Sequence, residues 1–319
     1  MRAWQVTELG EPGAVMRLRE DAAVPEPGEG QVLVRVRAAA VNFPDALICR
    51  GHYQSRPPLP FTPGLELCGE LPDGTRVIGT PVLPFGAYAE YALMDAGQVY
   101  PAPEALDDAE AAALHIGYQT AWFALHRRAA LKAGETLLVH AAAGGVGSAA
   151  VQLGKAAGAT VIGVVGGAEK ASVARELGAD VVVDRRSEDF VTVVKEATGG
   201  RGADVVFDPV GGGAYTGSAK CVAFEGRIVV IGFAGGAIPA PPLNHALVKN
   251  YSIMGLHWGL YVSKDPAAVR AAHAELTALA AKGVVRPLVS ERLPFAAAAR
   301  AVERVAAGTT TGRLVITGE

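Results

Sequence analysis

The sequence predicts an α/β protein in which a doubly wound parallel sheet is inserted into a partly open β-barrel. Three observations favour this fold class. Residues 1–115 read as short strands interrupted by glycine and proline, residues 116–259 alternate strands with helices, and residues 260–319 return to the first texture. A chain of 319 residues is long enough for two domains with separate cores. We therefore expect residues 1–115 plus 260–319 to form one domain and residues 116–259 to form the other.

The amino-terminal part is predicted to consist mainly of strands. Residues 31–37 alternate apolar and polar side chains, as a half-buried strand does. Asp73 and Gly74 form a turn signal directly before residues 75–78, which we expect to be a second strand. Residues 57–64 contain four prolines and are not expected to be helical, because proline lacks an amide donor and restricts the residue before it.

The middle of the chain alternates Val/Ile-rich runs with helix-forming segments. This pattern is typical of a parallel sheet covered by helices on both faces. The expected strands are residues 136–140, 160–165, 181–183, 203–207, 226–232 and 251–255, and the expected helices are one through Val151 and Leu153 and others at residues 168–177, 188–197 and 215–223. Further on, we expect a helix at residues 266–281 and strands at residues 290–294 and 313–316.

The strongest chemical signal follows the first strand of this middle region. Ala142, Gly144 and Gly147 occupy the three places of the G-x-G-x-x-G pattern, with alanine in place of the first glycine. In such a turn the backbone, here including Gly145 and Val146, approaches a pyrophosphate at the helix N-terminus. Because the turn follows a strand and opens a helix, it predicts a dinucleotide site of the Rossmann type. The alternative is a tight turn that binds no ligand.

The end of the next strand distinguishes the two nicotinamide cofactors. An NAD site usually places Asp or Glu there to bind the ribose 2′-hydroxyl, whereas this chain has Gly166, followed by Lys170 inside the next helix. Arg185 and Arg186 follow the third strand. Small residues with cations suit a 2′-phosphate, so we expect NADPH, bound in part by Gly166, Lys170 and Arg185. Alternatively, these cations are solvated surface charges and Glu169 contacts a ribose.

Composition and charge exclude several classes of protein. Hydrophobic residues make up 50% and charged residues 19%, which is typical of a folded globular protein. The net charge of -3 and the lack of a Lys/Arg run argue against nucleic acid as a partner. Cys49, Cys68 and Cys221 are too few and too scattered for a disulfide framework. With no signal-like start and no window of roughly 18 apolar residues, we expect a cytoplasmic protein without a membrane partner.

Three stretches, together with the glycine turn, resemble a known family. They are Val41-Asn42-Phe43-Pro44-Asp45, residues 58–66 and Gly117-Tyr118-Gln119-Thr120-Ala121. Over nearly its whole length the chain is similar to the medium-chain dehydrogenase/reductase superfamily, and within it to the zinc-free quinone oxidoreductase (ζ-crystallin-like) branch. The resemblance implies a GroES-like barrel as the catalytic domain. It also implies a homodimer that pairs through the strand near residues 251–255.

The resemblance also bears on metal binding. Zinc alcohol dehydrogenases of this superfamily carry a catalytic cysteine in the place of Asn42 and a histidine in the place of Leu65. An amide and a leucine do not replace a thiolate and an imidazole at zinc. The four-cysteine lobe of the structural zinc is also absent, since only Cys49 and Cys68 lie near that region. We therefore expect no metal site. The link between residues 70 and 76 is also shorter than in relatives, which is expected to trim a loop on the barrel.

Further cofactor contacts are expected outside the glycine turn. Gly232 and Phe233 end a predicted strand of the doubly wound sheet, and ligands bind at the carboxyl ends of such strands. The resemblance implies that Thr120 lies near the nicotinamide. Arg313, near the carboxyl terminus, is expected to be a surface residue rather than a phosphate contact.

A site without a Lewis acid favours reduction of a conjugated acceptor, such as a quinone or an α,β-unsaturated carbonyl, which delocalises the incoming charge. The candidate catalytic residues are Asn42, Asp45 and Tyr53. Asn42 would hold the nicotinamide ribose or the acceptor oxygen, Tyr53 would supply a hydrogen bond or a proton, and Asp45 would brace the loop. Alternatively, Asn42 caps a turn, Asp45 anchors a loop and Tyr53 is only packed.

Two other functions remain open at this point. The first is a trans-acting 2-enoyl thioester reductase, for which Arg50 and Arg56 would attract an anionic carrier. The second is a non-catalytic NADPH-binding or RNA-binding protein. The negative net charge argues against RNA, and an intact phosphate turn argues against a relic of the nucleotide fold.

Overall fold

The computed structural model describes residues 1–318, which form two compact units. Unit 1 contains Met1–Ile116 and the chain from His273 onward, and unit 2 contains Gly117–Ala272. The chain therefore enters unit 2 one residue after the expected boundary and leaves it after residue 272 rather than after residue 259.

The later exit has a physical reason. Gln119 lies in the first helix of unit 2, and its side-chain amide donates a hydrogen bond to the carbonyl of Val269 (3.3 Å). The same amide accepts a hydrogen bond from the indole of Trp258 (3.3 Å). The bond to Val269 attaches a residue beyond the expected boundary to unit 2, although the composition of this segment does not distinguish it from the segment that follows.

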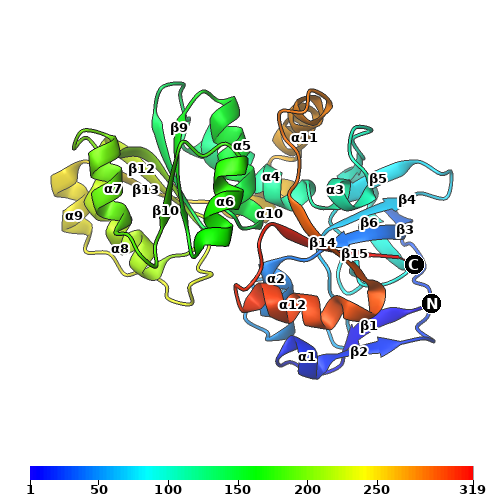
Figure 1. The fold of residues 1–319 in the computed structure, drawn as a ribbon. Helices are drawn as coiled ribbons and strands as arrows, with labels where there is room; N and C mark the ends of the chain where they lie inside the picture. Colours follow the sequence, from blue (N-terminus) through cyan, green and yellow to red (C-terminus); the bar gives the residue numbers. More distant parts are fainter. Residues whose placement is uncertain (319) are drawn as a thin grey trace. The chain divides into compact units, whose positions relative to one another are not determined.

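Unit 2 is built on a six-stranded parallel sheet (Figure 1). Its strands are β8 (Thr136–His140), β9 (Thr160–Val165), β10 (Val181–Asp184), β11 (Ala203–Asp208), β12 (Val222–Val230) and β13 (Ser252–Gly255). Their order in the sheet is β10-β9-β8-β11-β12-β13. The chain begins in the middle, proceeds to one edge and then crosses to the other, which is the doubly wound Rossmann topology. The predicted parallel sheet is confirmed.

Helices connect these strands and pack on them. They are α5 (Gly145–Ala156), α6 (Ala168–Glu176), α7 (Phe190–Ala197), α8 (Gly212–Cys221) and α9 (Leu243–Lys249). The other helical segments are α4 (His115–Trp122), the π-helical η2 (Phe123–Arg128), α10 (Trp258–Lys264) and α11 (Pro266–Ala281). Leu138, Ile162 and Val206 are fully buried between the sheet and these helices, so the Val/Ile-rich strands form the core of the unit.

One strand begins earlier than its sequence pattern predicts. β12 starts at Val222, which pairs with Ala203, and the register then shifts before Val205 pairs with Arg227. The expected strand at residues 226–232 corresponds to the regular part after this shift. Because the first rung forms four residues earlier, α8 ends at Cys221 rather than at residue 223.

Unit 1 is a mostly antiparallel β structure. Its main sheet has the order β14-β15-β3-β4-β5-β7, with β6 paired to β3, and β1 and β2 form a separate pair. The strands are β1 (Ala3–Val6), β2 (Met16–Arg19), β3 (Gln31–Ala40), β4 (Leu67–Glu70), β5 (Arg76–Gly79), β6 (Tyr91–Asp95), β7 (Val99–Pro101), β14 (Val289–Pro294) and β15 (Arg313–Thr317). β14 and β7 lie at the two ends of this path, as in a partly open barrel.

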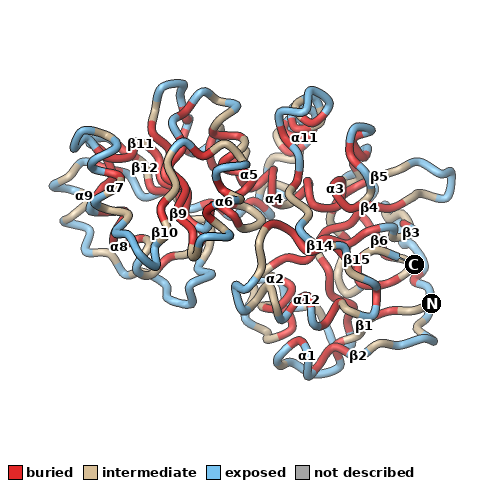
Figure 2. Tube along the Cα trace, viewed as in Figure 1, coloured by how far each residue is buried: buried red, intermediate tan, exposed pale blue. Residues whose placement is uncertain are grey.

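Few helices accompany this sheet. They are α1 (Pro12–Val15), α2 (Phe43–Cys49), α3 (Asp108–Ala112), α12 (Ala298–Ala306) and the 3-10 segments η1 (Ala96–Gln98) and η3 (Phe295–Ala297). α12 and α2 belong to one core cluster with the strands, in which Phe61, Leu67 and Tyr88 are almost completely buried. Figure 2 shows that buried residues gather in the strands of each unit, while many connecting segments are exposed. Within residues 1–318, no helix combines the length and apolar character that a membrane span requires.

Candidate active site

The glycine turn joins β8 to α5 in unit 2. α5 begins at Gly145 with Gly144 as its N-cap, so the amides of its first turn, including that of Val146, have no acceptor within the helix. A Cβ on Gly147 would lie 2.1 Å from the Ala141 carbonyl oxygen, whereas one on Gly144 would lie 3.2 Å from it. Glycine at 147 is therefore required for the helix to begin this close to the turn. Together these features form an anion site at a helix N-terminus.

The alanine in the first place of the turn has a compensating residue on the next strand. Ala142 is fully buried, and a Cβ added to Gly163 would lie 2.9 Å from its methyl group. Gly163, in the middle of β9, thus provides the space that Ala142 occupies. The glycine motif does not include Gly163, although an isolated glycine inside a Val-rich strand is a signal of close approach.

Three cationic side chains gather at the carboxyl end of β9. A Cβ on Gly166 would lie 3.3 Å from Nε of Arg185, and one on Gly167 would lie 3.0 Å from an Nη of Arg186. Both guanidinium groups therefore lie close to this glycine pair. Burial, and then the charges of Arg186 and Arg185, lowers the pKa of Lys170. Among the salt bridges of residues 1–318, none involves Arg185 or Arg186. The sequence predicts Lys170 and Arg185 as cofactor residues and places Arg186 directly after Arg185. In the structure all three cations lie near the glycine pair.

Asp184, the last residue of β10, is hydrogen-bonded to the backbone of the segments that carry these cations. Its Oδ1 accepts hydrogen bonds from the amides of Gly167 (2.8 Å) and Arg186 (3.0 Å). These bonds, and then the charges of Arg186 and Arg185, lower the pKa of this carboxyl. Gly167 has φ 107°, a conformation that favours glycine. Asp184 was not among the predicted site residues, since its role depends on a neighbouring strand.

The remaining predicted cofactor residues also belong to unit 2. Thr120 lies on α4 and is 8% exposed. Gly232 and Phe233 follow β12 at the carboxyl edge of the sheet, and the Phe233 ring is partly exposed. The glycine turn and the cation group lie at the same edge, because the strands are parallel and both groups follow strand ends.

In unit 1, Asn42 is the N-cap of α2. The nitrogen of its side-chain amide donates hydrogen bonds to two acceptors. Its Nδ2 donates to the carbonyl of Ala40 (3.1 Å) and to Oε2 of Glu66 (3.0 Å). An amide nitrogen carries two N–H donors, so both are used. Of the two roles expected for Asn42, donation to an acceptor oxygen is incompatible with these bonds. Its Oδ1 is the only acceptor of this side chain, and it faces the backbone amide of Asp45 in a capping box.

Asp45 is fully buried at the third position of α2. Its Oδ2 accepts hydrogen bonds from the amide of Asn42 (2.8 Å) and the hydroxyl of Tyr88 (2.6 Å), while its Oδ1 is buried without a hydrogen-bond partner. Burial raises the pKa of Asp45 to about 6, although the hydrogen bonds from Tyr88 and Asn42 oppose this increase. These contacts fix the start of α2. That Asp45 serves only to brace this segment stays a prediction.

Tyr53 follows α2 in the segment after Gly51. Its ring is partly buried and packs against the core of unit 1. Burial, and then the charge of Asp45, raises the pKa of its hydroxyl. The hydroxyl therefore keeps its proton at neutral pH and is a hydrogen-bond donor.

Asn42 is hydrogen-bonded to a buried ion pair that no local sequence pattern predicts. Glu66 is 0% exposed, and it pairs with Arg313, which is 5% exposed. Oε1 of Glu66 also accepts a hydrogen bond from the amide of Ile116 (2.6 Å). Arg313 was expected at the surface, and this expectation is wrong, because its guanidinium neutralises a carboxylate that is itself buried.

The described residues contain no group of three or more His, Cys, Asp or Glu side chains that could hold a metal ion. Asn42 is engaged as described above, and Leu65 packs against the core of unit 1. Cys49 and Cys68 are buried free cysteines, and neither belongs to a group of possible metal ligands among the described residues. The donor set around Asn42 therefore does not fit a catalytic zinc.

Comparison with known proteins agrees with this geometry. Residues 28–104 match the model of the alcohol dehydrogenase GroES-like domain, and residues 145–277 match that of the zinc-binding dehydrogenases. Quinone oxidoreductase-like protein 2 of Mus musculus is 39% identical over 297 residues, covering 90% of this chain and 83% of the relative.

Two solved structures are similar over the whole chain. The quinone oxidoreductase of Thermus thermophilus, also solved in complex with NADPH, is 34% identical with a TM-score of 0.88, covering 99% of this chain and 100% of that one. The Escherichia coli quinone oxidoreductase, complexed with NADPH, is 31% identical with a TM-score of 0.90 and the same coverage of each chain.

A Rossmann unit with a glycine turn, together with a GroES-like unit, defines a medium-chain dehydrogenase/reductase. Within that class, the chain belongs to the quinone oxidoreductase family, and it is an oxidoreductase of α/β fold.

Proposed function

We propose that this chain transfers a hydride from NADPH to a quinone or an α,β-unsaturated carbonyl, without zinc. The observation that carries the proposal is the cation group of Lys170, Arg185 and Arg186 over the Gly166–Gly167 turn, next to an intact glycine turn. Two quinone oxidoreductases of similar structure are complexed with NADPH, which supports the same cofactor here.

In this proposal, different residues of unit 2 bind different parts of NADPH. The amides at Gly144, Gly145, Val146 and Gly147 bind the pyrophosphate, with Ala142 shaping the turn. Lys170, Arg185 and Arg186 bind the 2′-phosphate, which carries more negative charge than the hydroxyl of NADH. Thr120, Gly232 and Phe233 contact the nicotinamide end.

The residues of unit 1 would position the acceptor and supply hydrogen bonds. NADPH, when bound, supplies the hydride. Tyr53 donates a hydrogen bond or a proton to the oxygen that gains charge, because its hydroxyl stays protonated. Asn42 accepts a hydrogen bond through Oδ1 from a ribose hydroxyl, held in place by Glu66. Asp45 braces α2 and does not touch the acceptor.

The test follows NADPH consumption by metal-stripped protein with an ortho-quinone, a simple enone and an enoyl-CoA offered separately. We expect turnover of the quinone or the enone, unchanged by a chelator and lowered at least tenfold by Tyr53→Phe. Tyr91→Phe, on strand β6, is the matched control and should leave kcat unchanged. Activity that is abolished by the chelator and restored by zinc would refute the zinc-free mechanism.

The same assay addresses the enoyl thioester alternative, which would be favoured by preferential turnover of the enoyl-CoA. Arg50 is less available to an anionic carrier than the sequence suggested, because it already has an acidic partner. Its guanidinium forms a two-pronged ion pair with Glu11, in which Nη2 lies 2.7 Å from Oε2. Arg56 would still attract an anionic carrier in this alternative. Tight NADPH binding without turnover of any acceptor would favour the non-catalytic alternative.

We also propose a homodimer that forms through strand β13. This strand is the last in its sheet, and Ile253 on it is 38% exposed. The nearby chain exposes further large apolar side chains, namely Ile238, Leu243, Leu247 and Val248. Exposed apolar side chains beside a sheet edge are typical of an interface. Light scattering should give twice the chain mass, and a monomer would refute this.

A further inference from the structure

A cavity lies at the edge of the unit 2 sheet where strands β11 and β12 begin. Its volume is about 310 Å³, and nine residues line it: Lys195, Gly200, Arg201, Gly202, Lys220, Cys221, Val222, Phe224 and Lys249. The glycine turn and the cation group lie at the opposite edge, where the strands end. The six residues of β11 separate the two edges, a distance of roughly 20 Å at about 3.3 Å per residue. The cavity is therefore distinct from the proposed NADPH site.

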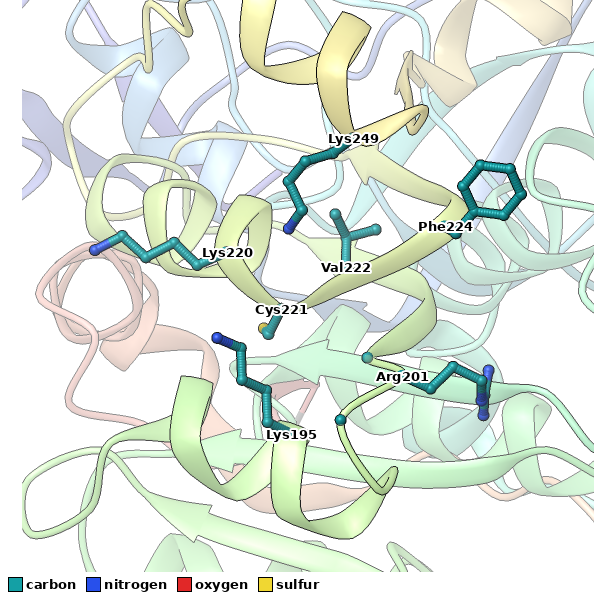
Figure 3. Close-up of a pocket in the computed structure, with 9 residues that line it drawn as sticks. Lys195, Arg201, Lys220, Cys221, Val222, Phe224 and Lys249 are labelled. Carbon is teal, nitrogen blue, oxygen red and sulfur yellow. The ribbon is translucent and has the colours of Figure 1, made fainter.

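The charge of this cavity is one-sided. Four of its nine lining residues are cationic and none is acidic. Arg201 pairs with Asp204, and Nζ of Lys249 donates a hydrogen bond to the carbonyl of Ala219 (2.8 Å). Within residues 1–318 neither Lys195 nor Lys220 forms a salt bridge. Figure 3 shows the ammonium groups of Lys195 and Lys249 pointing toward each other near Cys221, whereas Lys220 points away.

Helix dipoles account for each lysine singly but not for their convergence. Lys195, Lys220 and Lys249 lie in the last turns of α7, α8 and α9, where a cation offsets the negative end of the helix. The helix dipole explains why a lysine lies at each helix end. It does not explain why two of these lysines point into the same cavity. Two ammonium groups directed at one cavity repel each other. The pKa of Lys249 is lowered accordingly, by burial first, with the charge of Lys195 contributing.

The neighbouring cysteine does not supply the missing negative charge. Cys221 is 1% exposed, and burial raises the pKa of its thiol to about 11, even though Lys249 and Lys195 both act to lower it. The thiol therefore stays neutral at physiological pH. The charge of Asp189 also acts on Cys221 and on Lys220. Among the described residues, however, no carboxylate forms a salt bridge with Lys195 or Lys249, so an external anion can still pair with both.

We propose that this cavity binds the phosphate group of a small metabolite between Lys195 and Lys249. Phosphate oxygens accept charge-assisted hydrogen bonds from both ammonium groups at once. The cavity also has the size of the smaller ligand sites in proteins, which begin at about 300 Å³, so there is room for an organic part beside the phosphate. The exposed ring of Phe224 offers an apolar surface at the rim for that part.

Inorganic phosphate is the probe that tests the proposal. It is titrated by calorimetry, at constant ionic strength and with chloride as the reference anion, into the free full-length protein and into the protein saturated with NADPH. We expect saturable binding of one phosphate to the NADPH-saturated protein, in which the proposed cofactor site is filled, and of at least this one phosphate to the free protein. Binding should weaken at least tenfold in Lys195→Glu, whose carboxylate would pair with Lys249, and also in Lys249→Met.

Two controls separate this cavity from other cationic surfaces. Lys282→Met removes one exposed charge elsewhere and should not change the affinity. Arg185→Ala removes a cation of the proposed NADPH site and should also leave this binding unchanged. Because position 195 is exposed, Lys195→Glu should fold normally, which its thermal unfolding will verify. Three results would overturn the proposal: no saturable binding, binding that both cavity variants leave unchanged, or binding that disappears when NADPH is present.

Discussion

At the scale of single residues, the environment of Asn42 changes what this side chain can do. From its type alone, an asparagine offers both donors and an acceptor. Glu66 and the carbonyl of Ala40 occupy both donors, so only the acceptor remains. The carboxylate responsible is in turn neutralised by Arg313, 247 positions further along the chain. A pairing this distant is not visible in local sequence patterns.

The cations over the Gly166–Gly167 turn give the first prediction. Replacing both Arg185 and Arg186 with alanine should weaken NADPH binding by about tenfold or more per arginine, because each removes a charge-assisted contact of about 1.5–3 kcal/mol. NADH binding should change by less than a factor of about three. Cofactor fluorescence titration measures both dissociation constants.

Arg175→Ala is the matched control, since this exposed arginine lies in the last turn of α6, at the end of the helix away from the Gly166–Gly167 turn. It should leave both dissociation constants unchanged. If the double variant weakened NADPH and NADH equally, the two arginines would not contact a 2′-phosphate.

At the scale of elements, the start of α5 depends on the absence of a single methyl group. Gly147→Ala would place a Cβ 2.1 Å from the Ala141 carbonyl oxygen, and that neighbour is backbone. The helix would have to shift away from the turn. We expect a loss of about 2–4 kcal/mol in the free energy of unfolding and at least tenfold weaker NADPH binding. Urea unfolding and cofactor titration measure the two effects.

Gly213→Ala provides the control for this prediction. Gly213 lies in the first turn of α8, and nothing lies within 4 Å of a Cβ added there. Since alanine is the better helix former, this variant should be neutral or up to about 1 kcal/mol more stable. Equal destabilisation of both variants would show that contact with Ala141 is not the cause.

The sequence predicted the helices and strands themselves better than the boundaries of strands and of the two units. Strand β8 and helix α6 follow from runs of a few adjacent residues, so their periodicity is visible directly. The early start of β12 depends on pairing with Ala203 in another strand, and the extension of unit 2 to residue 272 depends on Gln119. Neither partner is a sequence neighbour, so neither boundary could be predicted.

At the scale of the whole molecule, buried histidines should set the acid limit of stability. His140 is 2% exposed, and its Nε2 lies 2.8 Å from Oγ of Ser218. Burial lowers its pKa to about 4, although the charge of Asp208 opposes this. His115 is also buried, and its pKa is lowered to about 3 by burial and by His273. Both side chains are therefore neutral in the folded protein at neutral pH.

The sign of the pH dependence follows from these pKa values. Between the ordinary histidine pKa of 6.5 and about 4, the unfolded chain binds a proton at position 140 that the folded protein does not. The free energy of unfolding should therefore decrease as pH falls through this window, by up to about 1.4 kcal/mol per pH unit for one such group. Asp45, whose pKa is raised to about 6, acts in the opposite direction.

His140→Phe isolates this contribution, because it removes the titrating group and leaves the other groups in place. Its stability should fall less steeply between pH 6.5 and 4 than that of the unchanged protein. Ser218 keeps a hydrogen bond to the carbonyl of Ala214 (2.7 Å) in the variant. Urea unfolding at several pH values measures the slopes, and identical slopes would contradict a buried neutral His140.

The sequence by itself determined the two-part α/β architecture, the glycine turn at residues 142–147 and the lack of a carboxylate at the end of β9. Each follows from residues that are adjacent in the chain. Only the tertiary structure decided that Arg313 is buried against Glu66, that Asn42 has no free donor and that Arg186 joins Arg185 over Gly167. The physical reason is that burial and hydrogen-bond partners depend on which distant segments pack together, and local patterns do not specify this.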